Sequence, residues 1–142
     1  MMNRKIDENC NSSSLNISKL KVGIIGNGVM GKQIVRLHTE KEIDTTIFVK
    51  KDRIGNINTE DRLLKFTSEV SDLMNCDIVI ESLPELIDVK VKYFCRLLEL
   101  GYSGLLCTNT STITLKEFYA KGISKNSPGG TEKNFSCIQR SQ

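Results

Sequence analysis

Short β-rich apolar runs alternate with segments of helical periodicity between residues 19 and 122 of this 142-residue chain. The first run, residues 20–26, ends in glycine, as expected for a buried strand of a parallel sheet. Apolar residues between 86 and 97 recur at spacings of three and four, which predicts a helix of about four turns. The full pattern predicts strands at residues 20–26, 45–49, 64–67, 77–82 and 105–108, and helices at residues 28–41, 69–74, 86–97 and 115–121.

This alternation predicts one α/β domain, a doubly wound parallel sheet covered by helices on both faces. We assign the domain to residues 19–122. Residues 1–18 are polar and serine-rich, which predicts a disordered leader. Residues 123–142 lose all apolar periodicity, which predicts an unstructured tail.

Charge and composition exclude several classes of protein. The net charge of +3 arises entirely beyond residue 120, and no stripe of lysine and arginine interleaved with aromatic residues is present, so no nucleic-acid partner is expected. No apolar run reaches the roughly 18 residues that cross a bilayer, and because the first residues lead into Ser and Asn and not into an apolar stretch, we expect no secretory signal. We therefore expect a soluble, cytoplasmic protein without a membrane partner. Five cysteines without a CxxC pair and a single histidine, His38, predict no metal site.

A glycine-rich turn follows the first predicted strand and opens the first predicted helix, and its sequence fits GxGxxG. In a dinucleotide-binding turn of this kind, Gly26 permits the tight bend and Gly28 lets the backbone approach a pyrophosphate. Gly31 allows close packing of helix on strand. The helix N-terminus then faces the phosphates with free N–H groups. The pattern predicts a Rossmann-like dinucleotide site formed by Gly26, Asn27, Gly28, Val29, Met30 and Gly31.

The end of the second predicted strand bears on the choice of cofactor. An acidic residue is expected there when NAD is bound, because it holds the ribose 2′-hydroxyl. This chain has Lys50, Lys51 and Arg53 instead. Cations can pair with a 2′-phosphate, so NADP is favoured. Asp52, in the same segment, leaves NAD as the alternative.

Residues 20–33 resemble the opening of the pyrroline-5-carboxylate reductase superfamily and of related NADP-dependent oxidoreductase-domain proteins. Residues 76–84 and 113–118 extend the resemblance. It implies hydride transfer between NADPH and a small imine, with the cofactor held by the glycine turn, the end of the second strand and the turn after the fourth. That turn contains Ser82, Leu83 and Pro84. The family's helical C-terminal domain, with its substrate pocket and dimer contacts, has no counterpart here, so we expect a homo-oligomer or a completing partner chain.

A second resemblance leads to a different oxidoreductase. Residues 81–90 and 108–112 are similar to segments of 3-hydroxyacyl-CoA dehydrogenases. This resemblance places Glu85, Lys90 and Asn109 near the nicotinamide end and Ser111 near the substrate oxygen, with NAD as cofactor.

The two resemblances leave three hypotheses for function. The dehydrogenases have Asp where Lys50 stands and need a His–Glu pair, whereas no histidine follows His38. We therefore take the NADP-dependent reductase as the main hypothesis and the dehydrogenase-like NAD-binding domain as the alternative. A non-catalytic NADP-binding protein is the third. No catalytic residue is assigned, and Glu81, at the end of a strand, is expected to be solvated.

Overall fold

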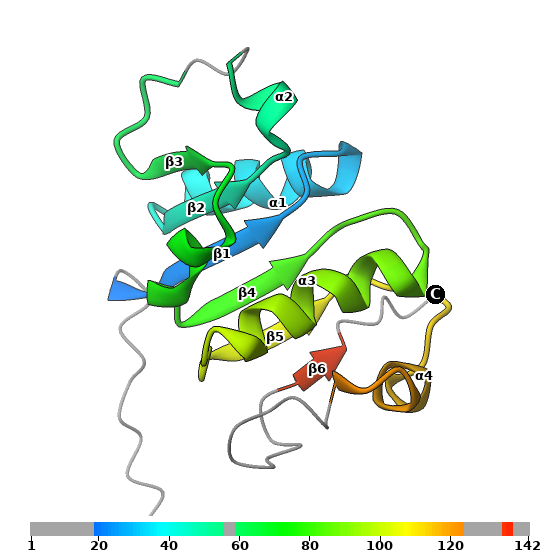
Figure 1. The fold of residues 1–142 in the computed structure, drawn as a ribbon. Helices are drawn as coiled ribbons and strands as arrows, with labels where there is room; N and C mark the ends of the chain where they lie inside the picture. The colour runs from blue at the N-terminus through cyan, green and yellow to red at the C-terminus, as the bar shows by residue number, and fades with distance from the viewer. Residues whose placement is uncertain (1–18, 56–58, 124–134, 138–142) are drawn as a thin grey trace, which may run out of the picture.

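The computed structural model describes residues 19–55, 59–123 and 135–137. Its centre is a six-stranded, fully parallel sheet with the strand order β3-β2-β1-β4-β5-β6 (Figure 1). This is the doubly wound order of dinucleotide-binding domains, in which the chain reverses direction across the sheet between β1 and β4. The strands are β1 (Lys21–Ile25), β2 (Asp44–Phe48), β3 (Leu64–Thr67), β4 (Ile78–Glu81), β5 (Leu105–Thr108) and β6 (Phe135–Cys137).

Helices cover both faces of the sheet, with α1 on one face and α3 on the other (Figure 1). Alternate strand residues point to opposite faces. Ile24 and Ile47 therefore pack with residues of α1, whereas Ile25 and Phe48 belong to the larger core cluster under α3 and α4. The helices are α1 (Val29–Glu40), α2 (Lys51–Ile54), the 3₁₀ helix η2 (Val70–Asn75), α3 (Ile87–Glu99) and α4 (Leu115–Ala120).

The predicted α/β fold is confirmed, and β3 and β5 begin and end at the predicted residues. The short helix α2 was not predicted, because four residues are too few to show a helical period. The unstructured tail is wrong for Phe135–Cys137, which pair in parallel with β5. A strand this short carries no readable alternation, and its pairing depends on the free edge of β5. The other residues beyond 123 and the predicted leader lie outside the described residues.

Within the described ranges, no helix combines the length and the apolar character needed to cross a membrane. The same ranges contain no group of three or more His, Cys, Asp or Glu residues placed to hold a metal ion. Cys76 and Cys107 are buried free thiols, and Cys95 is a partly buried one.

Candidate functional site

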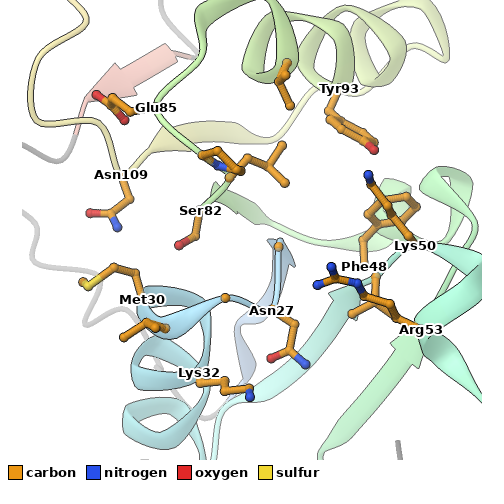
Figure 2. A pocket seen from close by; sticks show the side chains of 17 residues that line it. Asn27, Met30, Lys32, Phe48, Lys50, Arg53, Ser82, Glu85, Tyr93 and Asn109 are labelled. Carbon is orange, nitrogen blue, oxygen red and sulfur yellow. The ribbon is translucent and has the colours of Figure 1, made fainter. Parts of the chain in front are cut away.

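A cavity of about 800 Å³ opens at the carboxyl ends of β1, β2, β4 and β5 (Figure 2). This is the edge of a doubly wound sheet where ligands bind, at the point where the strand order reverses. Lys50 and Arg53 lie at one end of the cavity, and Glu85 and Asn109 at the other (Figure 2). The lining residues are Gly26, Asn27, Gly28, Val29, Met30, Lys32, Phe48, Val49, Lys50, Arg53, Ser82, Leu83, Pro84, Glu85, Val89, Tyr93 and Asn109.

The three glycines of the turn have different physical roles. Gly26 has φ +107°, and a Cβ there would lie 2.6 Å from the carbonyl oxygen of Ser82. At Gly31 a Cβ would lie 2.1 Å from the Gly26 carbonyl oxygen, so this position is fixed by packing, and it does not line the cavity. A Cβ at Gly28 would meet no atom within 4 Å and would project into open space at the cavity wall. Packing therefore explains the glycines at positions 26 and 31, whereas Gly28 leaves space for a ligand in the cavity.

Two features at the middle of the cavity are suited to a polar ligand. Helix α1 begins directly after Gly28, without a side-chain cap and without an acidic residue in its first turn. The first-turn N–H groups of a helix have no partners within the helix, and they favour an anion. The Ser82 hydroxyl lines the same cavity and is buried without a hydrogen-bond partner within the described part of the chain. Such orphaned groups are rare, because each costs desolvation energy.

The end of the cavity beyond β2 is basic. Lys50 and Arg53 line it, and neither forms an ion pair with any described residue. Lys51 and Asp52, which also belong to this segment, do not line it. The rings of Phe48 and Tyr93, with centroids 5.3 Å apart and tilted by 60°, form an aromatic wall at this end.

A buried ion pair lies beneath the opposite end. Glu81 and Lys90 are both fully buried, and Lys90 Nζ donates to the two carboxylate oxygens of Glu81 at 2.8 and 3.0 Å. Thr108 Oγ1 at 2.6 Å and the backbone N–H of Leu83 also donate to Glu81. The expectation that Glu81 is solvated is therefore wrong. Its side chain lies under α3, where Lys90 neutralises it, and buried charges persist only when paired and hydrogen-bonded.

Glu85 ties the turn after β4 to the loop after β5. The Thr110 hydroxyl, the N–H groups of Ser111 and Thr112 and the Thr112 hydroxyl all donate to Glu85 Oε1, and Lys90 Nζ lies 3.3 Å from Glu85 Oε2. Burial acts to raise the pKa of Glu85, but the bonds from Thr110 and Thr112 and the charge of Lys90 outweigh it and lower the pKa to about 2. This carboxylate is thus an ionised acceptor and a poor base at neutral pH.

Most of the predicted site residues meet at this cavity. Of the residues predicted to bind NADP, only Gly31 and Lys51 do not line it, and Asp52, named as the alternative in favour of NAD, does not line it either. Of those implied by the dehydrogenase resemblance, Glu85 and Asn109 line it, whereas Lys90 and Ser111 do not. His38 lies on α1, away from the cavity, with Nδ1 3.2 Å from Thr45 Oγ1.

Sequence reasoning missed Lys32, Phe48, Val49, Val89 and Tyr93 as lining residues, and it missed the pairing of Glu81 with Lys90. The aromatic and apolar members carry no motif. The only sequence signal for the ion pair is a lysine, Lys90, set between Val89 and Val91 on an apolar helix face.

Comparisons with known proteins place the chain in a family. The family model described as 3-hydroxyacyl-CoA dehydrogenase, NAD binding domain, matches residues 48–127, more than half of the chain. A probable 3-hydroxybutyryl-CoA dehydrogenase from Deinococcus radiodurans is 26% identical over 119 residues, which cover 68% of this chain and 43% of that protein.

Solved structures of dehydrogenases are also similar to this chain. The dehydrogenase part of multifunctional enzyme 1 from C. elegans is 26% identical with a TM-score of 0.65, over 84% of this chain and 31% of that one. A 3-hydroxyacyl-CoA dehydrogenase from Archaeoglobus fulgidus is 25% identical with a TM-score of 0.63, over 86% and 42%. A pyrroline carboxylate reductase from Plasmodium falciparum with NADP bound, 14% identical with a TM-score of 0.61 over 87% and 43%, is similar in fold alone.

The chain spans less than half the length of each of these relatives. The matching family is that of the 3-hydroxyacyl-CoA dehydrogenases, which was the alternative hypothesis. The main hypothesis, membership of the pyrroline-5-carboxylate reductase superfamily, is therefore replaced by this alternative. The chain belongs to the family of 3-hydroxyacyl-CoA dehydrogenase NAD-binding domains, pyridine-nucleotide-binding oxidoreductase domains of the Rossmann type.

Proposed function

We propose that this domain binds a nicotinamide dinucleotide along the cavity and serves hydride transfer between that cofactor and a 3-hydroxyacyl-CoA/3-oxoacyl-CoA pair. The observation that carries the proposal is the glycine turn, where Gly28 leaves open space beside the Ser82 hydroxyl, which has no hydrogen-bond partner among the described residues. Backbone N–H groups at the start of α1 suit the pyrophosphate. The adenosine half would lie toward Lys50 and Arg53, and the nicotinamide half toward Glu85 and Asn109. When bound, the nicotinamide supplies the hydride chemistry, and the protein supplies binding and orientation.

We further propose that the preferred cofactor is NADP(H). The family match favours NAD, but this chain has two free cations at the adenosine end and no carboxylate among the described residues lining that end. A ribose 2′-phosphate can form charge-assisted hydrogen bonds with Lys50 and Arg53, whereas a 2′-hydroxyl gains little from them.

None of the described residues that line the cavity is a suitable base for proton transfer. Oxidation of a 3-hydroxyl group requires a base that accepts the hydroxyl proton as the hydride leaves. Glu85 is the one carboxylate among the described lining residues, its pKa is lowered to about 2, and it is held by the loop after β5. His38 lies away from the cavity. We propose that a second polypeptide supplies the base, either a copy of this chain or a separate substrate-binding chain.

The function is tested first by binding and then by turnover. We expect saturable binding of NADPH, followed by nicotinamide fluorescence and thermal shift together. We also expect oxidation of bound NADPH by acetoacetyl-CoA, at a rate per chain that rises with protein concentration as copies associate. Oxidation by 1-pyrroline-5-carboxylate alone would restore the reductase hypothesis. Binding without turnover of either compound at any protein concentration would exclude a copy of this chain as the source of the base, and would leave a separate substrate-binding chain or a non-catalytic NADP-binding protein.

A Ser82→Ala variant is expected to separate stability from binding. Because the buried Ser82 hydroxyl has no partner in the part of the chain that the structure describes, its removal should leave the melting temperature of the free protein unchanged or slightly raised. Affinity for the dinucleotide should fall about fivefold, the equivalent of one hydrogen bond of about 1 kcal/mol. Ser71→Ala, at an exposed serine outside the cavity lining, is the matched control. An unchanged dinucleotide affinity in Ser82→Ala would exclude the hydroxyl from the site.

A further inference from the structure

A third cation, Lys32, lines the cavity without an ion-pair partner among the described residues. It is the fourth residue of α1, and its side chain is exposed. The helix dipole opposes a positive charge this close to a helix N-terminus, and the first turn of α1 contains no acidic residue that would offset it. The stability of α1 therefore gives no reason for a lysine at this position, whereas an anion in the cavity does.

The Lys32 side chain extends toward the basic end of the cavity. Side chains of a helix lean toward its N-terminus, so the ammonium group of the fourth residue can lie beside the first turn. Figure 2 shows this side chain running from α1 toward the side of the cavity where Arg53 lies. Met30, two residues earlier on α1, lies on the other side, toward Asn109 (Figure 2). Lys32 therefore belongs to the half of the cavity proposed for the adenosine half of the dinucleotide.

Three cations thus approach the basic end from two different elements. Lys50 and Arg53 come from the segment after β2, and Lys32 comes from α1. None of the three has an acidic partner among the described residues. The one carboxylate in the described lining, Glu85, lies at the opposite end and is paired with Lys90. Like charges repel one another, so this arrangement suits a ligand that brings more than one negative charge to the basic end.

A phosphate monoester meets this requirement. It carries a charge of about −1.5 to −2 at pH 7 and has three strong acceptor oxygens. Lys50 and Arg53 can bind the oxygens on their own side, and Lys32 is available to an oxygen turned toward α1. A ribose 2′-hydroxyl is uncharged and gains little from a further cation. The pyrophosphate has other donors, namely the backbone N–H groups at the start of α1 and the Ser82 hydroxyl.

We infer that Lys32 binds the 2′-phosphate of NADP(H) from the side of α1 and is a third determinant of cofactor specificity. The inference rests on the proposed function and deepens it, because it adds a residue of the helix after the glycine turn to the recognition of the 2′-phosphate. Specificity for the cofactor then depends on α1 as well as on the segment after β2.

The test is a Lys32→Met variant, titrated with NADPH and with NADH by nicotinamide fluorescence. NADPH affinity should fall about tenfold, the loss expected for one charge-assisted hydrogen bond, and NADH affinity should not change. Lys32→Arg retains the charge and should keep most of the affinity for NADPH. Because Lys32 is exposed and its charge is opposed by the helix dipole, the melting temperature of the free Lys32→Met protein should be unchanged or slightly raised. A lysine with a structural role would instead lower it when replaced.

Smaller ligands locate the contact within the cofactor. Competition with NADPH is measured for 2′,5′-ADP, which carries the 2′-phosphate without a pyrophosphate, and for ADP, which carries a pyrophosphate without the 2′-phosphate. Lys32→Met should bind 2′,5′-ADP about tenfold more weakly and ADP as well as the wild-type chain does. Lys41→Met is the matched control, because Lys41 is an exposed lysine at the other end of α1 that does not line the cavity. It should leave all four affinities unchanged.

Four results would overturn the inference, and each has a different meaning. Equal losses of NADPH and NADH affinity in Lys32→Met would assign the lysine to the pyrophosphate. Unchanged affinity for both would exclude Lys32 from the site. A wild-type chain that prefers NADH would remove the 2′-phosphate site as a whole, but not the dinucleotide site. A wild-type chain that binds neither dinucleotide would remove the proposed function itself.

Discussion

A Lys50→Asp, Arg53→Ala double variant is expected to bind NADH more tightly than NADPH, reversing the proposed preference of the parent chain. Both side chains line the adenosine end of the cavity, and neither has an acidic partner among the described residues. Their loss removes the charges available to a 2′-phosphate. The new carboxylate repels that phosphate and can accept a hydrogen bond from a 2′-hydroxyl, the arrangement found in NAD-binding domains.

The size of the effect follows from the number of charges lost. Hydrogen bonds to charged groups contribute about 1.5–3 kcal/mol each, and the exposure of these two side chains places them at the lower end. Two such bonds amount to about 3 kcal/mol, so NADPH affinity should fall by a factor of roughly 150. The preference of the parent chain should also weaken as ionic strength rises, because salt screens exposed charges.

Lys51→Ala is the control for this experiment, because Lys51 belongs to the same basic segment but does not line the cavity. Its NADPH affinity should match that of the parent chain. Binding is measured by nicotinamide fluorescence titration with each cofactor. Equal losses for NADPH and NADH in the double variant would contradict the assignment of Lys50 and Arg53 to the 2′-phosphate.

Substitutions at two glycines of the turn are expected to have different effects: Gly31→Ala should lower stability, and Gly28→Val should lower cofactor affinity. Gly31→Ala places a Cβ 2.1 Å from the Gly26 carbonyl oxygen, and the neighbouring atoms are backbone that cannot rotate away. We expect a loss of about 2–3 kcal/mol in the free energy of unfolding, as for severe overpacking, and a fall of about 10 °C or more in melting temperature. Gly28→Val meets no atom within 4 Å, and φ there is −77°, which any residue adopts. Its stability should stay within about 0.5 kcal/mol of the parent chain.

Cofactor binding distinguishes the two variants further. The valine side chain in Gly28→Val occupies the cradle proposed for the pyrophosphate, so dinucleotide affinity should fall by a factor of about 100 or more. Gly55→Val is the matched control, since a Cβ at Gly55 also meets no atom within 4 Å and this glycine does not line the cavity. Thermal unfolding and fluorescence titration of the three variants provide the measurements. A folded Gly28→Val protein with unchanged dinucleotide affinity would remove the glycine turn from the site.

Local patterns were sufficient to predict much of the fold. β1, β4 and β5 are short, mainly apolar runs bounded by turn residues, β2 and β3 are short β-rich segments, and α3 shows helical periodicity over its whole length. Predictions made from such local signals came within a few residues of the observed bounds. β6 was missed because its pairing depends on the edge of β5, which its own three residues do not encode.

For the candidate site, too, the sequence determined one part and the tertiary structure decided another. Sequence alone determined the glycine turn, because the positive φ of Gly26 and the close approach of Gly31 to the Gly26 carbonyl oxygen both arise between a strand and the helix that directly follows it. Only the tertiary structure decided which cations of the basic segment line the cavity, because the short helix α2 directs Lys50 and Arg53 differently from Lys51. Only the tertiary structure, too, paired Glu81 with Lys90. A carboxylate at a strand end is solvated or buried according to whether a cation from another element reaches it, and that depends on how α3 packs over the sheet.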